Sequence, residues 1–147
     1  MKLEIERDAR GENLQAFRDF IEDACRRAGV EPSAAFDLKL AVDEACSNII
    51  EHGYSGNEPG PIGVSFDAGG GQVVVEIADR GRPFDPKSVR APDLDSRWQD
   101  RRVGGLGWYL IGRSVDTIGY DSDPQRGNRL KLIKKVTLGE SARTRSD

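Results

Sequence analysis

A continuous helical pattern runs through residues 37–54, which read DLKLAVDEACSNIIEHGY. Its apolar residues recur at the three- and four-residue spacing of one buried helix face, namely Leu38, Val42, Ala45 and Ile49. Pro32 ahead of this stretch suits a first helical turn, and Gly53 suits a left-handed residue that closes the last one. The fold must therefore place another layer of structure against this helix.

The same stretch carries two polar residues that a core helix does not need. Glu44 and Asn48 lie one helical turn apart, so their side chains project from a common face. A solvated pair on an exposed face is the ordinary interpretation. The alternative is that the helix presents a carboxylate and an amide to a binding site.

The remaining chain supplies strands and two more helices. Alternating apolar residues predict strands at 2–7, 62–67, 72–78, 115–120 and 129–136, and helical spacing predicts helices at 12–28 and 105–115. The first strand is short and suits a sheet edge, and the glycines at 69–71 join the second and third strands as a hairpin. This order predicts an α+β fold, a two-layer sandwich with helices on one face of a mainly antiparallel or mixed sheet.

Composition limits the class of protein. At 147 residues the chain has room for one domain, which we assign to residues 1–136, with a flexible polar tail at 137–147. The net charge of −3 disfavours direct contact with nucleic acid. The lack of any apolar run of about 18 residues disfavours a membrane span. Cys25 and Cys46 occupy apolar helical positions without metal-binding spacing, which predicts reduced core thiols in a cytoplasmic protein.

Three short motifs contain glycine at the expected ends of strands or helices. Asp79-Arg80-Gly81 ends a predicted strand, where the carboxylate can accept from an exocyclic amine and the glycine permits close approach of a ligand. Gly105-Leu106-Gly107 opens a helix whose free N–H groups suit an anion. Gly127-Asn128 leads into the last strand. Each motif is also ordinary turn chemistry, so only their combination has weight.

A long segment at residues 80–104 separates the first two motifs. It is rich in charge, glycine and proline and has little apolar periodicity. Loops of this length in a compact domain are usually functional or disordered. The sequence therefore predicts a mobile lid.

In this order, Glu44-x-x-x-Asn48, Asp79-x-Gly81, the lid and Gly105-x-Gly107 resemble the Bergerat ATP-binding fold shared by DNA gyrase, sensor histidine kinases and heat-shock chaperones. The short chain, the DEACSNIIEHGY segment and the Pro83-Phe84-Asp85 continuation resemble the anti-sigma factor serine kinases of bacterial partner-switching systems. The resemblance covers about residues 3–136.

The resemblance implies ATP and Mg²⁺ as cofactors. It makes Asn48 the protein ligand of the magnesium ion, Glu44 the general base for the attacked hydroxyl, and Asp79 the acceptor for the adenine amine. The implied nucleotide-binding backbone and adenine-region contacts are Gly81, Gly105, Leu106, Gly107, Gly127 and Asn128. One lid cation, Lys87, Arg101 or Arg102, would meet the phosphates.

The implied function is that of a serine kinase that holds a sigma factor and phosphorylates an anti-anti-sigma antagonist, as a homodimer through the first strand. Two alternatives stay open: a nucleotide-gated partner-binding regulator without phosphotransfer, and a plain ATP hydrolase. Three departures from the family pattern bear on this choice. Arg82-Pro83 replaces a second glycine, Val103 stands where an arginine is expected, and Asn128 stands where a threonine is usual.

Overall fold

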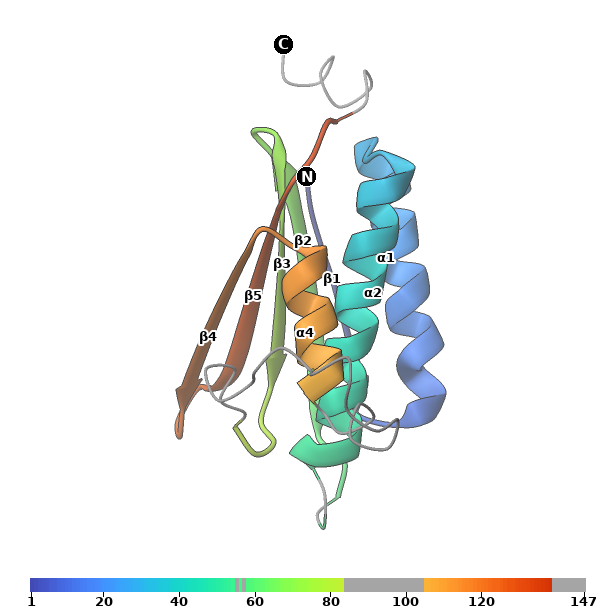
Figure 1. Cartoon of the computed structure of the whole chain (residues 1–147). Helices are drawn as coiled ribbons and strands as arrows, with labels where there is room; N and C mark the ends of the chain where they lie inside the picture. The colour runs from blue at the N-terminus through green and yellow to red at the C-terminus, as the bar shows by residue number, and fades with distance from the viewer. Residues whose placement is uncertain (55, 57, 84–104, 139–147) are drawn as a thin grey trace.

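The computed structural model of the chain describes residues 1–54, 56, 58–83 and 105–138, with the backbone alone at 105–108. The helical elements are η1 (Gly11–Asn13), α1 (Leu14–Ala28), α2 (Pro32–Asn48), η2 (Ile49–Gly53) and α4 (Gly105–Ser114). The strands are β1 (Lys2–Asp8), β2 (Pro61–Gly69), β3 (Gln72–Asp79), β4 (Thr117–Asp123) and β5 (Gly127–Lys135). Each predicted helix and strand is present, with boundaries shifted by a few residues (Figure 1).

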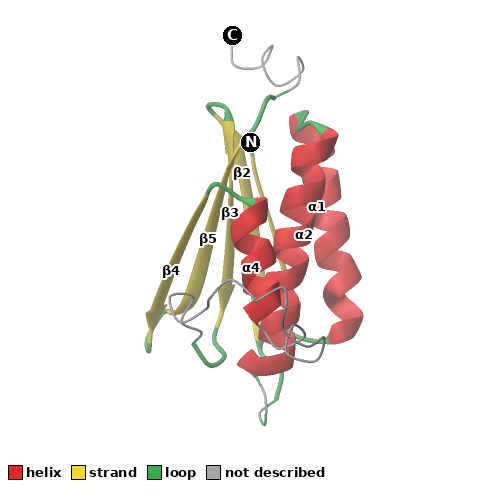
Figure 2. Ribbon diagram, in the orientation of Figure 1, coloured by secondary structure: helices red, strands yellow, loops and turns green. Residues whose placement is uncertain are grey.

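The five strands form one sheet in the order β1-β2-β3-β5-β4, and every neighbouring pair is antiparallel. The α-helices pack side by side on one face of this sheet (Figure 2). The predicted two-layer α+β sandwich is therefore confirmed, and β1 is an edge strand as expected.

Alternation of side chains decides which face the helices cover. Every second position of β2 and β3 is buried, namely Ile62, Val64, Phe66, Ala68, Val73, Val75, Ile77 and Asp79. The predicted hairpin between these strands is confirmed: Gly70 and Gly71 form its two-residue turn, with φ of 61° and 78°. Two successive positive φ values suit a type I′ turn, which matches the twist of the strands it joins.

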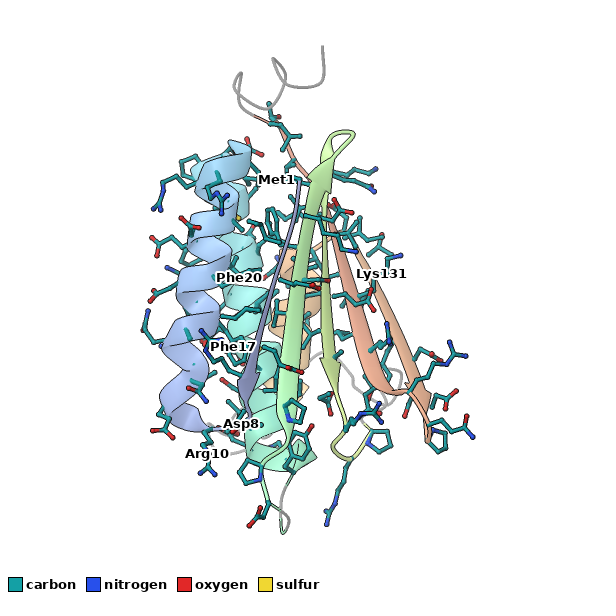
Figure 3. The ribbon with its side chains drawn as sticks, turned by 180° about the vertical axis from the view of Figure 1, so that it is seen from behind. Met1, Asp8, Arg10, Phe17, Phe20 and Lys131 are labelled. Atoms are coloured by element: carbon teal, nitrogen blue, oxygen red, sulfur yellow. The ribbon has the colours of Figure 1, made fainter. Side chains whose placement is uncertain are left out.

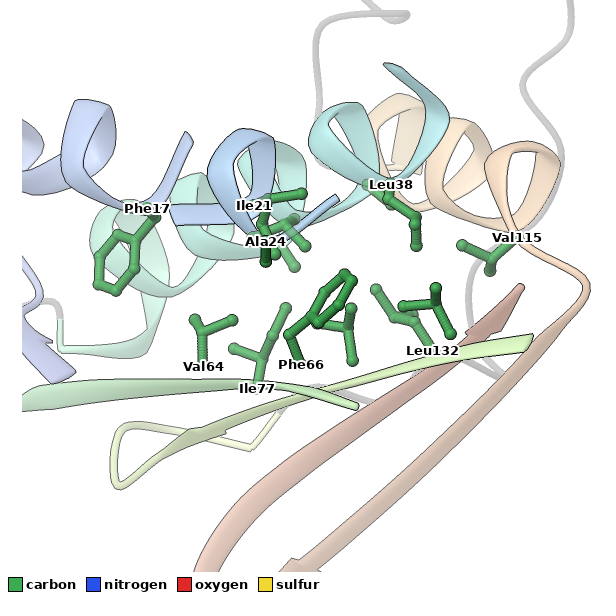
Figure 4. Close-up of a cluster of buried hydrophobic side chains, with 14 of the residues drawn as sticks. Phe17, Ile21, Ala24, Leu38, Val64, Phe66, Ile77, Val115 and Leu132 are labelled. Atoms are coloured by element: carbon green, nitrogen blue, oxygen red, sulfur yellow. The ribbon is translucent and has the colours of Figure 1, made fainter. Parts of the chain in front are cut away.

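The core lies between the helices and the sheet. Phe17 and Ile21 of α1 and Leu38 of α2 point towards the sheet, and Phe66 and Leu132 point from the sheet towards the helices; all five are fully buried (Figure 4). The two cysteines, Cys25 and Cys46, are free and buried beside them, as predicted. Burial raises the pKa of the Cys25 thiol to about 12 and raises that of Cys46 further. Both therefore remain protonated apolar groups at neutral pH.

Helix α2 begins at Pro32, as predicted, but its end differs from the prediction. After Asn48 the chain widens into the π-helical turn η2, and Gly53 does not adopt a left-handed φ. The predicted left-handed cap at Gly53 is therefore wrong. The left-handed cap occurs instead on α1, at Gly29 with φ of 74°. A Cβ on residue 53 would lie 3.3 Å from Ile49 Cγ2, closer than an ordinary contact.

The opposite face of the sheet carries no helix among the described residues. Lys131 of β5 points away from the helices, whereas Phe17 and Phe20 lie on the helix side (Figure 3). Within the described parts of the chain, no helix is long and apolar enough to cross a membrane.

Most residues of the predicted lid and of the predicted tail lie outside the part of the chain that the structure describes. Of the predicted lid at residues 80–104, residues 84–104 lie outside the described residues, and of the predicted tail at 137–147, residues 139–147 do. Of the predicted tail, Leu138 forms an isolated antiparallel bridge with Val30 and packs against the core.

Candidate functional site

A cavity of about 220 Å³ lies where η2 meets the ends of the central strands. Six of the residues that line it are Ala45, Asn48, Ile49, His52, Asp79 and Leu130. Two predicted site residues, Asn48 and Asp79, thus share one cavity although 31 positions separate them in the chain. Its wall is mostly apolar, with a carboxylate and an amide inside it, as is typical of a small-molecule site.

Asp79 is the last residue of β3 and is only 8% exposed. Its Oδ1 accepts two hydrogen bonds, from the Gly81 backbone N–H at 2.8 Å and from Asn128 Nδ2 at 3.0 Å. Burial raises the pKa of this carboxyl group, and the two hydrogen bonds act in the opposite direction. The Gly81 N–H and Asn128 Nδ2 both donate to Oδ1. The other carboxylate oxygen, Oδ2, can therefore accept a hydrogen bond from a ligand.

The loop after Asp79 is clamped onto η2. The Arg82 N–H donates to the Gly53 carbonyl at 2.6 Å, and a Cβ on Gly81 would lie 2.5 Å from that same oxygen. The two backbones are therefore in direct contact at the Gly53 carbonyl. This contact leaves no room for a side chain at position 81, which requires glycine there.

Tyr54 provides a second link to the same loop. Its hydroxyl accepts from the Arg80 N–H at 2.8 Å and donates to the Pro61 carbonyl at 2.9 Å. Tyr54 is not predicted as a site residue from the sequence, because no spacing rule connects residue 54 with residue 80. The only available signal was a tyrosine at the end of the helical pattern, since a buried tyrosine hydroxyl usually has a partner.

Gly127 and Asn128 lie directly beside Asp79, because β3 and β5 pair Asp79 with Asn128. Gly127 has φ of 84°, and a Cβ there would lie 2.6 Å from the Asp79 carbonyl oxygen. Asn128 is 3% exposed and donates to Asp79 and to the Gly81 carbonyl. The sheet thus brings two motifs together that are 46 residues apart, from Gly81 to Gly127.

Asn48, the last residue of α2, lines the cavity from the helix side. Asn48 Nδ2 is buried and has no hydrogen-bond partner among the described residues. Such an unpaired amide is costly unless a ligand engages the side chain. Glu44, one turn earlier, is half-buried and is not among the described residues that line the cavity. Burial raises its pKa, and the nearby charges of Asp43 and Glu51 raise it further.

Helix α4 starts with the predicted Gly105-Leu106-Gly107 segment, at the same end of the molecule as η2 (Figure 1). Lys134 of β5 holds the other end of this helix, since its Nζ donates to the Ser114 carbonyl at 2.9 Å and lies 3.1 Å from Asp37 Oδ2. A cation at a helix C-terminus is electrostatically favourable. The lid candidates Lys87, Arg101 and Arg102, and Val103, lie outside the described residues.

Comparison with known proteins agrees with this geometry. The family model described as histidine kinase-like ATPase domain matches residues 8–134. An anti-sigma F factor of Clostridium botulinum is 33% identical over 103 residues, which cover 69% of this chain and 71% of that protein. A serine-protein kinase RsbW of Halalkalibacterium halodurans is 30% identical over 125 residues, which cover 82% and 76%.

A solved structure supports the fold. The crystal structure of the RsbU and RsbW domains of Rv1364c from Mycobacterium tuberculosis aligns with a TM-score of 0.68 at 20% identity. The alignment covers 92% of this chain and 32% of that one.

Replacing Gly81 with alanine tests the contact between the loop and η2. The new Cβ would meet backbone atoms of Gly53 that cannot move aside, so we expect a loss of about 1–3 kcal/mol in the free energy of unfolding. Gly112→Ala is the matched control, because its Cβ would meet only Ile118 Cδ1 at 3.9 Å, an ordinary contact. Urea unfolding followed by circular dichroism measures both. Equal midpoints for Gly81→Ala and wild type would contradict the clamp.

Proposed function

Because the chain belongs to the histidine kinase-like ATPase family, and within it to the anti-sigma factor serine kinases, we propose that it is an ATP-dependent kinase that phosphorylates an anti-anti-sigma antagonist protein on serine. In this proposal it also binds a sigma factor and releases it when the antagonist is not phosphorylated. The observation that carries the proposal is the single cavity containing both Asn48 and Asp79. The relatives named anti-sigma F factor and serine-protein kinase support the choice of partners.

ATP binding rests on the end of β3. Asp79 Oδ2 would accept a hydrogen bond from the adenine amine, and Gly81 and Gly127 keep side chains away from the loop that carries it. The N-terminus of α4, at Gly105 to Gly107, would offer free backbone N–H groups to the phosphates.

The residues present also fit a magnesium ion held between the protein and the phosphates. Asn48 lines the cavity and its amide oxygen is a suitable ligand, because Mg²⁺ accepts one or two protein oxygens while it keeps waters and phosphate ligands. The atom of this side chain that lacks a partner among the described residues is the donor Nδ2. The described residues contain no cluster of three or more acidic, histidine or cysteine side chains, so the phosphates would complete the coordination. Bound there, the ion would neutralise phosphate charge during transfer.

Glu44 is the proposed general base. Its burial and the neighbouring carboxylates move its pKa upward, towards the operating pH at which a base is most effective. Its position outside the cavity lining favours one alternative, a nucleotide-gated regulator that holds a partner without phosphotransfer.

The adenine contact can be tested with Asp79→Asn. We expect ATP affinity to fall about 10- to 150-fold, which corresponds to roughly 1.5–3 kcal/mol for a hydrogen bond to a charged group. Isothermal titration calorimetry measures this change. A wild-type protein that binds no adenine nucleotide at millimolar concentration would contradict the proposal.

The same variant tests the cost of burying the charge. The pKa of Asp79 is raised in the fold, so the folded state favours the neutral form and gains stability as pH falls through that pKa. Asp79→Asn is neutral at every pH, and its unfolding midpoint at pH 7 should therefore not lie below that of wild type. A lower midpoint would show that the two hydrogen bonds outweigh the burial cost.

Variants of two residues on α2, Glu44 and Asn48, distinguish phosphotransfer from nucleotide binding. Glu44→Gln should keep nucleotide and partner binding but lower phosphorylation of the antagonist about 10²- to 10⁴-fold, as expected for loss of a general base. Asn48→Ala should also weaken Mg²⁺-dependent nucleotide binding, because it removes an oxygen ligand. Labelled ATP with the antagonist measures transfer. Equal rates for wild type and Glu44→Gln would exclude Glu44 as the base, and nucleotide-gated partner binding without transfer in wild type would favour the regulator.

We also propose that two copies associate through β1. Among the described strands β1 pairs only with β2, so its other edge is open. Met1 and Ala68 exchange both backbone hydrogen bonds, at 3.0 and 2.9 Å. Because such pairs alternate along an antiparallel ladder, the N–H and C=O groups of Lys2, Glu4 and Glu6 point towards the open edge.

Glu4→Pro tests this interface without disturbing β2. Proline removes an outward N–H that the β1–β2 ladder does not use, and edge strands tolerate it. We expect Glu4→Pro to sediment as a monomer at a concentration where wild type and the control Glu4→Ala sediment as dimers. A dimeric Glu4→Pro, or a monomeric wild type, would contradict pairing through β1.

A further inference from the structure

Asn128 has a hydrogen-bond environment that its place in the sequence does not suggest. Its Nδ2 donates to Asp79 Oδ1 at 3.0 Å and to the Gly81 carbonyl at 2.9 Å, and its Oδ1 accepts from Ser122 Oγ at 2.7 Å. The side chain therefore joins the end of β3, the loop that follows it and the edge strand β4.

Only one orientation of this amide fits its surroundings. Two acceptors, a carboxylate and a carbonyl, face one end of the side chain, and the Ser122 hydroxyl faces the other. A flipped amide would set its oxygen against both acceptors, with the loss of two hydrogen bonds and a repulsive contact. Both hydrogens of Nδ2 are thus used inside the protein, and no donor is left for a nucleotide.

The consequence appears at Asp79. Two donors hold its Oδ1, the Gly81 N–H and the Asn128 amide, and this fixes the plane of the carboxylate. Asp79 lines the cavity, whereas Asn128 is not among the described residues that do so. Asn128 therefore acts on a bound base through Asp79 and not by contact.

We propose that Asn128 is a positioning residue that sets base selectivity: it fixes Asp79 so that a single carboxylate oxygen, Oδ2, meets the ligand. An acceptor fixed in this way favours a purine with an amine at the contact position and disfavours one with a hydrogen or a carbonyl there. This inference rests on the proposed function, since it concerns the same nucleotide site. The threonine that is usual at this position would contact the adenine region directly through its hydroxyl. Asn128 acts instead through Asp79.

Two nucleotides distinguish positioning from a merely structural role. ATP and purine riboside triphosphate differ only in the exocyclic amine, so the ratio of their affinities reports the contact with Asp79. We expect wild type to prefer ATP by about 10- to 150-fold, the range for a hydrogen bond to a charged group. In Asn128→Leu, which has a similar volume but no donor, the ratio should fall to within about threefold of unity, mostly through weaker ATP binding.

Ser122→Ala is the matched control. It removes the hydroxyl from Asn128 Oδ1 but leaves both Nδ2 hydrogen bonds, and water can reach the exposed edge strand in its place. The affinity ratio of this variant should stay within about twofold of wild type. A ratio as low as that of Asn128→Leu would overturn the assignment to the Nδ2 contacts.

Calorimetric titration of each variant, after thermal unfolding has shown that it is folded, gives the result. If Asn128→Leu weakens both nucleotides by the same factor and keeps the wild-type ratio, Asn128 is only structural and the inference fails while the proposed function stands. If wild type binds neither nucleotide, both fail. Should Asn128→Leu not fold, Asn128→Ser replaces it, because its side chain is too short to reach Asp79 and Gly81 together, and the same two outcomes apply.

Discussion

The buried carboxylate of Asp79 constrains the structure at this end of the molecule. An isolated buried charge costs several kcal/mol, so it persists only where hydrogen-bond donors surround it. The Gly81 N–H and the Asn128 amide supply them, and the backbone geometry that brings both within reach requires glycine at 81 and 127. The identities of residues from two separate segments thus follow from one buried group.

Much of the fold was predictable because it depends on local periodicity. Alternation in β2 and β3, helical spacing in α1 and α2, and the glycine pair of the hairpin are properties of short segments. The mistaken cap at Gly53 shows the limit of such rules. A glycine at the end of a helical pattern is usually left-handed, but Gly53 belongs to the π-helical turn η2, and its carbonyl contacts the backbone of residues 81 and 82, which no local pattern records.

Some residues of the candidate site could be predicted from local sequence motifs and others could not. Asn48 and Asp79 were identified from motifs, and the fold places them in one cavity. Tyr54 and Ser122 were not identified, because each acts through a hydrogen bond to a residue that is distant in sequence or across a strand pair. Asn128 was identified for a direct contact with the adenine region, whereas its hydrogen bonds connect it to Asp79. Residue type shows that a side chain can bond, but only the paired strands show to what.

At the π-helical turn η2, the number of residues matters to this site as much as their type. A π-turn contains one residue more than an α-helical turn, and in η2 it delivers Gly53 and Tyr54 to the loop after β3. Loss of a single residue between Asn48 and Gly53 would leave the apolar pattern of α2 intact. It would nevertheless rotate the tyrosine hydroxyl by about 100° around the helix axis, away from Arg80. Loss of Ile50 or Glu51 would therefore alter the cavity without removing any of the described residues that line it.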